Sequence, residues 1–568
     1  MVGRIFARIA APVRTLVMRP VRSLHQAAYL LAGLTLASQG IALLRDRTFA
    51  HTFGAGPTLD LYYAAFRVPD LVFALVSSLV SAYVIIPRIT GMDREATRKL
   101  LSESATFLFA FGGLLCVALA FLMPQFLALL YPSFIASPLH GEFVLLARIL
   151  LLQPILLGLS GVIASVTQVH RRFFLYALSP VLYNLGIILG TVVFYPRWGL
   201  PGIGVGVVIG AVGYLAVHIP VVIEAGVLPR LRLPRFAHMA PIVRDSIPRS
   251  LALGMSSITV LVLTAIASRI GTGSVSVFTF AGNLEAVPLA LVGASYAVAA
   301  FPALSEASAL ERREEFTNIL SASARHIILW SIVFLGLIIV LRAHIVRVVL
   351  GTGAFDWDAT RLTAALLAVL AVGLAADALK LVFSRALYAA RQSWRPLLYQ
   401  IAGGGVTILL ALWFLSLVPS GMPAVLAVWL RVGDVPGTEI LLVALAATLG
   451  QIFLALLSLI ALRNVAPGLT RTLVRPIFDG SCAALAGGAS AYATLALAGD
   501  IAPLTTLAAV FVEGLIAGMV GLAAAALTLY LIGNKEFRII VDALLALVRA
   551  HSGRSAVLVP SAEEPAKL

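Results

Sequence analysis

The segment Arg45–Pro87 reads RDRTFAHTFGAGPTLDLYYAAFRVPDLVFALVSSLVSAYVIIP and joins two strongly apolar stretches of the chain. Five charged side chains lie at or inside the ends of these stretches: Arg45, Asp46, Asp60, Arg67 and Asp70. A charged group at membrane depth costs roughly 3 kcal/mol unless it is paired or hydrated. Such groups therefore indicate a transport pathway or a ligand site within a membrane protein.

The composition of the whole chain is that of a polytopic membrane protein. Of its 568 residues, 60% are hydrophobic and 12% are charged, and apolar runs of helix-spanning length recur throughout. The two cysteines, Cys116 and Cys482, both lie in apolar runs, which argues against a disulfide framework or a thiolate metal site. The net charge of +15 is spread over short loops, as topology signals are, and does not indicate nucleic acid.

The hydropathy pattern predicts an all-α protein with about fourteen transmembrane helices, each long enough to cross roughly 30 Å of hydrocarbon. The expected spans are 25–44, 61–86, 104–131, 143–169, 173–195, 199–224, 247–269, 275–303, 325–350, 361–390, 396–418, 439–462, 478–499 and 503–533. With the N-terminus inside, thirty of the 41 Lys and Arg residues fall on the cytoplasmic side and eight on the other. The positive-inside rule therefore predicts that both termini are cytoplasmic.

A weak internal repeat predicts two lobes. Pro180-Val-Leu-Tyr-Asn184 recurs as Pro396-Leu-Leu-Tyr-Gln400, and Gly54-Ala-Gly56 recurs as Gly271-Thr-Gly273, both about 216 residues later. That offset holds six spans, so the lobes should be parallel repeats related by an axis along the membrane normal. The expected parts are a basic amphipathic segment (1–24), an N-terminal lobe (25–225), a basic linker (226–246), a C-terminal lobe (247–463), two extra helices (478–533), and an amphipathic helix with a tail (534–568).

Intramembrane polar groups are the strongest functional signal. The candidate substrate-binding residues are Arg45, Asp46, Asp60, Arg67, Asn283, Glu285, Asp377 and Lys380. Purely structural roles remain as alternatives. Arg45 and Asp46 could be a pair at the membrane interface, and Asp60 could cap its own helix. Asp377 and Lys380 lie three residues apart on one helix face and could neutralise each other. The candidate hinges are Pro69, Pro288, Gly54 and Gly56, and a helix broken at Pro69 should bend to line a cavity.

The sequence contains no enzyme signature. It has no P-loop, no H-E-x-x-H motif and no G-x-S-x-G motif in a strand-to-helix context. We therefore expect no enzymatic activity, no cofactor, no metal site and no nucleic-acid partner. Any work must come from an ion gradient, the membrane potential or the substrate gradient.

Three motifs resemble the start of MurJ/MviN proteins: S-Q-G-I-A-L-L-R-D (38–46), F-G-A-G-x-x-x-D (53–60) and A-F-R-V-P-D (65–70), followed by Pro87. The run R-A-L-Y-A-A-R-Q-S-W-R-P (385–396) is similar to the segment that joins spans 10 and 11 in this family. The family consists of lipid II flippases of the multidrug/oligosaccharidyl-lipid/polysaccharide exporter superfamily. The resemblance implies two lobes around a cationic cavity and a groove formed by the last two helices. It also implies alternating-access transport of an undecaprenyl-pyrophosphate-linked peptidoglycan precursor across the bacterial inner membrane, with membrane lipids and glycan assembly enzymes as partners.

Residue by residue, the resemblance carries over only in part. Arg45 matches a cavity arginine of the family, Asp46 and Asp60 match its acidic partners, and Arg67 falls where members often have a basic residue. Other basic or acidic positions of the family are replaced here: by Gln39 in span 1, by Phe73-Ala74 and Ser78-Leu79 in span 2, and by Asn283 in span 8. These departures predict a less positive cavity and a cargo that is lipid II or a related lipid-linked glycan.

Two other functions remain as alternatives. A small-molecule exporter of the MATE type, driven by Na⁺ or H⁺, would commit buried carboxylates to cation coupling, for which Glu285 and Asp377 are the candidates. A non-transporting scaffold in a polysaccharide assembly complex is allowed by the replaced arginines. The retained Arg45, Asp60 and Arg67 argue against the scaffold.

Overall fold

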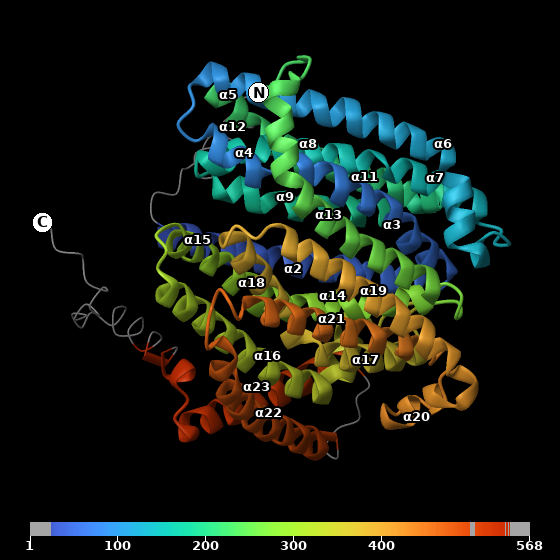
Figure 1. Ribbon diagram of the computed structural model, residues 1–568. Helices are drawn as coiled ribbons and strands as arrows, with labels where there is room; N and C mark the ends of the chain where they lie inside the picture. The colour runs from blue at the N-terminus through green and yellow to red at the C-terminus, as the bar shows by residue number, and fades with distance from the viewer. Residues whose placement is uncertain (1–23, 500–505, 540, 543–544, 546–568) are drawn as a thin grey trace, which may run out of the picture.

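The computed structural model describes residues 24–499 and 506–539, together with 541, 542 and 545. Every regular element in this part of the chain is helical, as a lipid-exposed chain requires, because a helix satisfies its backbone hydrogen bonds internally. Figure 1 shows long helices lying side by side in one bundle, with α20 projecting at one end. The predicted basic segment (1–24) and most of the amphipathic helix and tail (534–568) lie outside the described residues.

The helices divide at a linker that runs from Gly226 to Arg235. The N-terminal half contains α2 (Leu24–Phe53), α3 (Pro57–Val76), η1 (Ser77–Val80), α4 (Ala82–Ile89), α5 (Arg94–Phe107), η2 (Leu108–Gly112), α6 (Gly113–Leu130), η3 (Pro132–Phe134), α7 (His140–Leu150), α8 (Leu152–Val169), α9 (Phe173–Leu189), η4 (Gly190–Phe194), α10 (Tyr195–Trp198), α11 (Leu200–Ala216) and α12 (Ile219–Ala225). The C-terminal half contains α13 (Phe236–Ala267), α14 (Ser274–Pro288), η5 (Leu289–Ala294), α15 (Ser295–Ala309), α16 (Arg313–Val349), α17 (Trp357–Val372), α18 (Leu374–Ala389), α19 (Trp394–Ser416), η6 (Val418–Ser420), α20 (Met422–Trp429), α21 (Ile440–Leu462), α22 (Leu469–Gly499) and α23 (Leu507–Ile532).

Twelve helical segments of the described chain are long and apolar enough to cross a membrane. The count rises to thirteen if α17 and α18, which meet at an angle of 47°, form one bent span. All these segments coincide with predicted spans. The remaining predicted span (25–44) lies in α2, a helix of 30 residues that begins at the edge of the described chain and is outside this count. The predicted total of fourteen is therefore not confirmed.

The second predicted span is interrupted later than expected. The helix α3 continues through Pro69 and ends at Val76, and the chain then passes through the tight turn η1 and an extended Ser81 before α4 begins. The prediction of a helix broken at Pro69 is therefore wrong. In the corresponding span of the C-terminal half, Pro288 ends α14 and leads into η5, which has the wider π-helical winding.

Glycines bring α9 and α11 into direct backbone contact. A Cβ atom added at Gly206 would lie 2.3 Å from the Cα atom of Gly190, and one added at Gly186 would lie 2.4 Å from the Cα atom of Gly210. Small residues at such positions let transmembrane helices approach closely and pack tightly. These four glycines therefore serve the packing of α11 against α9 and the turn that follows it.

The last two spanning helices pack on one side of the bundle. Both α22 and α23 contact α16 and each other, and Figure 1 shows them at the margin of the molecule in orange and red. Asn534, just after α23, is held there by a 2.8 Å hydrogen bond from its amide nitrogen to the Asp479 carboxylate of α22. The two cavities described below are lined only by residues of α3–α21, so α22 and α23 do not contribute to them.

Candidate functional site

The two halves of the chain meet at one end of the bundle through Asp60. Its carboxylate accepts hydrogen bonds from the backbone N–H of Gly273 (2.6 Å), the backbone N–H of Ser276 (2.8 Å) and the Ser276 hydroxyl (2.6 Å). Asp60 is 1% exposed. It therefore caps the N-terminus of α14 in the C-terminal half, and not its own helix α3, where the sequence had placed the alternative capping role.

Backbone contacts around Asp60 close the same end. The Arg47 guanidinium donates to the carbonyl of Val348 at 2.6 Å, and the N–H of Ala354 donates to the carbonyl of His51 at 3.0 Å. Gly54, with a φ of +62°, lies so close to Ala354 that an added Cβ atom would be 2.4 Å from that carbonyl oxygen. This end of the bundle, where α2 and α3 meet α14 and the loop after α16, is called the closed end below.

Arg45 and Asp46 form the next layer, one step further into the bundle. The Arg45 guanidinium pairs with the Asp46 carboxylate at 2.7 Å and donates to the Asn184 side-chain oxygen at 2.9 Å. The other Asp46 oxygen accepts a 2.9 Å hydrogen bond from the Asn283 amide. Asp46 is 2% exposed, so the pair is a buried link from α2 to α9 and α14 rather than an interfacial pair.

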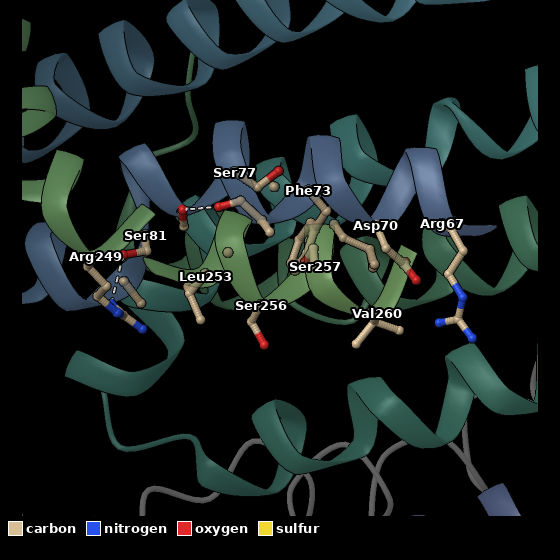
Figure 2. A pocket seen from close by; sticks show the side chains of 16 residues that line it. Arg67, Asp70, Phe73, Ser77, Ser81, Arg249, Leu253, Ser256, Ser257 and Val260 are labelled. Atoms are coloured by element: carbon tan, nitrogen blue, oxygen red, sulfur yellow. Dashed lines mark hydrogen bonds between the residues drawn. The ribbon is translucent and has the colours of Figure 1, made fainter. Parts of the chain in front are cut away.

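A cavity of 510 Å³, named here the arginine cavity, runs between α3–α4, α8 and α13. Its charged lining residues are Arg67, Asp70 and Arg249, and five serines also line it: Ser77, Ser78, Ser81, Ser256 and Ser257. Figure 2 shows Arg67 at one end and Arg249 at the other, where it contacts the Ser81 hydroxyl at 3.4 Å. Arg67 makes one long contact, 3.4 Å to the Thr279 hydroxyl, and its buried Nε atom has no partner in the described chain.

A second cavity of 260 Å³, named the threonine cavity, shares Arg67, Ser256 and Val260 with the first. Its wall contains four threonines, two glutamines, Asn283 and the acidic residues Glu285 and Asp377. The Lys380 ammonium bonds to the Asp377 carboxylate at 2.7 Å and to the Gln451 oxygen at 2.8 Å. Glu285 is 8% exposed and makes no hydrogen bond or ion pair with any other described residue.

The predicted site residues therefore fall into three groups. Arg45, Asp46 and Asn283 form one hydrogen-bonded cluster, Asp60 lies apart at the closed end, and Arg67 joins the two cavities. Glu285 and Asp377 line the threonine cavity, and Lys380, which does not line it, forms with Asp377 the ion pair that their spacing predicts. Within the described chain, no group of three or more His, Cys, Asp or Glu side chains is arranged to hold a metal ion.

Sequence reasoning missed Arg249 and the serines of α13. Arg249 lies near the predicted start of a span, where a basic residue is expected as a topology signal, so its position alone did not distinguish it. The available signal was the run Ser246 to Ser257, which places polar side chains well inside an apolar helix.

Comparison of the sequence with known protein families identifies the family of this chain. A family model described as lipid II flippase MurJ matches residues 49–467, which is most of the chain. The chain belongs to the MurJ family. The lipid II flippase MurJ of Burkholderia cenocepacia is 25% identical over 392 residues, covering 66% of this chain and 75% of that protein. A probable lipid II flippase MurJ of Thermotoga maritima is 26% identical over 377 residues, covering 66% and 76% respectively.

Solved structures agree on the fold. A lipid II flippase MurJ in an inward closed conformation superposes with a TM-score of 0.70 at 20% identity, covering 89% of this chain and 99% of that one. An inward-facing MATE family transporter of the MOP superfamily superposes with a TM-score of 0.61 at 16% identity, covering 78% and 99%. The chain is thus a multi-pass membrane protein with the transporter fold of this superfamily, and the MurJ structure is the more similar of the two.

Proposed function

We propose that this protein is a flippase that moves lipid II across the bacterial inner membrane. Family membership supplies the cargo class, and one observation of the structure carries the proposal: a cavity with a guanidinium at each end, in a bundle whose two halves are joined at one end through Asp60. Arginine side chains bind phosphate oxygens through two parallel hydrogen bonds, which suits the pyrophosphate of a lipid-linked precursor. The intervening serines offer hydroxyls to the polar headgroup.

Transport would proceed by alternating access. The halves 25–225 and 247–463 would act as two lobes, and the links that hold the closed end would break as it opens. These links include the Asp60 cap on α14, the Asp46–Asn283 hydrogen bond, the contacts of Arg47 and His51 with backbone groups, and the hydrogen bond from the Ser133 hydroxyl to the Ser268 carbonyl. Each joins the two halves, so each would have to break for the lobes to separate at this end.

The positive-inside asymmetry supports both termini in the cytoplasm, and the closed end would then face the periplasm. The chain would do no covalent chemistry and would work on a membrane lipid, with glycan assembly enzymes supplying and using the cargo. The ion pair between Lys380 and Asp377 favours the flippase over a Na⁺-coupled exporter, because the ammonium already occupies the position beside the carboxylate that a cation would take.

A reconstituted flipping assay tests the proposal. Proteoliposomes carrying the wild type should move lipid II, and should leave a cationic drug untransported in a parallel assay. Arg67→Gln should lose most lipid II transport, whereas Arg148→Gln, which removes an intramembrane arginine bound to the Ala120 carbonyl and outside both cavities, should retain it. Transport of the drug but not of lipid II, or wild-type transport by Arg67→Gln, would contradict the proposal.

A further inference from the structure

The arginine cavity is too long for its two arginines to hold the same phosphate group. Arg67 and Ser81 lie fourteen residues apart on α3–α4, which corresponds to about 20 Å of helical rise. Arg249 reaches the cavity beside Ser81, at the far end from Arg67 (Figure 2). A pyrophosphate group is only a few ångströms long, so one such group cannot contact both guanidinium groups.

The far end is built to receive an anion. Arg249 projects from α13 across to the Ser81 hydroxyl, and Ser78 fixes the adjacent turn by donating a 2.7 Å hydrogen bond to the Ser250 hydroxyl of the same helix. Further along α13, the hydroxyls of Ser256 and Ser257 line the cavity and make no hydrogen bond to other described residues. They continue a polar track from Arg249 towards Arg67, with hydroxyl donors left for a ligand.

The two ends differ in their place along the transport path. Arg67 is seven residues from Asp60, roughly 10 Å along α3, so it lies near the closed end. Arg249 lies further along the same helix path, beside Ser81, where α4 begins. A headgroup that enters from the side opposite the closed end therefore meets Arg249 before it meets Arg67.

We propose that Arg249 and Ser81 form a second anion subsite, which captures the pyrophosphate of a prenyl-linked cargo on entry and passes it along the serine track to Arg67. The inference rests on the proposed flippase function, and adds a subsite and an order of occupancy to it. The uncharged Phe73 of span 2 lines the cavity wall between the two subsites. Arg249 then supplies positive charge to this cavity.

The test counts bound molecules of a short probe. Farnesyl pyrophosphate, which carries the prenyl pyrophosphate but no glycan, is titrated into the full protein in nanodiscs, and its stoichiometry is read by native mass spectrometry. The wild type should bind two molecules, Arg249→Gln one, Arg67→Gln one, and the double variant none. Arg244→Gln is the matched control, because it removes an exposed arginine of the same helix that lines neither cavity, and it should bind two.

Two conservative variants guard against a folding defect. Arg249→Lys and Ser81→Ala keep most of the packing. Each should raise the dissociation constant of the probe at the Arg249 subsite roughly tenfold, the effect of losing one hydrogen bond to a charged group. A wild type that binds one probe molecule, or binding unchanged in Arg249→Gln, overturns the subsite. If the wild type binds two probe molecules in an Arg249-dependent manner but does not move lipid II, the subsite stands and only the proposed cargo fails.

Discussion

The Asp60 carboxylate and the backbone N–H of Gly273 form a 2.6 Å hydrogen bond across 213 residues of sequence. With the two contacts to Ser276, it gives α14 an N-cap that another part of the chain provides. A helix N-terminus carries unsatisfied donors and a partial positive charge, so a buried carboxylate stabilises it strongly. Opening the closed end would separate the Asp60 carboxylate from these donors. The cap therefore lowers the free energy of the closed state relative to the open state.

Asp60→Ala should therefore loosen the closed end. Removing the acceptor leaves two backbone N–H groups and a hydroxyl without partners, at a cost of about 1–3 kcal/mol to the closed state. Amide hydrogen exchange of the peptide that contains Gly273 and Ser276 should accelerate by a factor of roughly five or more. Asp93→Ala is the matched control, because Asp93 caps α5 within its own half, through the N–H of Ala96, and should leave that peptide protected. Equal exchange in Asp60→Ala and the wild type would refute the cap as a lock.

Asp46 and Asn283 should be energetically coupled. They share a 2.9 Å, partly buried hydrogen bond between a carboxylate and an amide, and hydrogen bonds to charged groups contribute about 1.5–3 kcal/mol. A double-mutant cycle with Asp46→Ala and Asn283→Ala, read by reversible unfolding in mixed micelles, should show an interaction energy of about 1 kcal/mol or more. A cycle of Asp46→Ala with Asp93→Ala, which share no partner, should give a value near zero. A coupling energy near zero in the first cycle would mean that the link does not hold the halves together.

Lys380→Met should destabilise the protein far more than removal of a surface lysine. The substitution leaves the part-buried Asp377 without its ammonium partner, and the cost should lie between the roughly 1 kcal/mol of an exposed pair and the roughly 3 kcal/mol or more of a fully buried one. Lys99→Met removes an exposed partner of Glu95 on α5 and should cost less than about 0.5 kcal/mol. The thermal midpoint in detergent distinguishes the two. Addition of Asp377→Asn to Lys380→Met should restore part of the loss, and failure to do so would argue that the lysine acts by packing alone.

Gly206→Ala should separate α9 from α11. The new methyl group would lie 2.3 Å from the Gly190 Cα atom, and overpacking of this kind costs about 1–3 kcal/mol. Gly213→Ala is the control on the same helix, since its methyl group would meet Leu182 at an ordinary 3.6 Å. Alanine also favours a helix over glycine by about 1 kcal/mol, so the control should be neutral or stabilising. A thermal midpoint of Gly206→Ala at or above that of the control would contradict the close contact.

Local patterns predicted what depends on neighbours in sequence. Hydropathy located the spanning helices, because each must present apolar surface for its whole length. The spacing of Asp377 and Lys380 predicted their ion pair, because residues three apart share a helix face. The start of the second span was predicted at residue 61, whereas α3 begins four residues earlier, at Pro57.

Partners distant in sequence were not predictable in this way. Asp60 looked like a cap for α3 because nothing near it in sequence points to Gly273. Pro69 was expected to break its helix, but α3 passes through it, and the break comes at Ser77–Ser81, where the Ser77 hydroxyl binds the Pro154 carbonyl of α8. Arg249 lines the cavity because α13, which is distant in sequence, packs against η1.

The cap on α14 also has a consequence for synthesis in the membrane. Asp60 is made 213 residues before the amide that it binds, so α3 and the five spanning segments between it and Gly273 must enter the bilayer while this carboxylate still lacks its partner. A lone carboxylate in that position has to stay hydrated, protonated or shielded until the second half arrives. The insertion machinery would therefore hold the first half in a partly open, water-accessible form, and a ribosome stalled before Gly273 should leave Asp60 reachable by water-soluble carboxyl reagents.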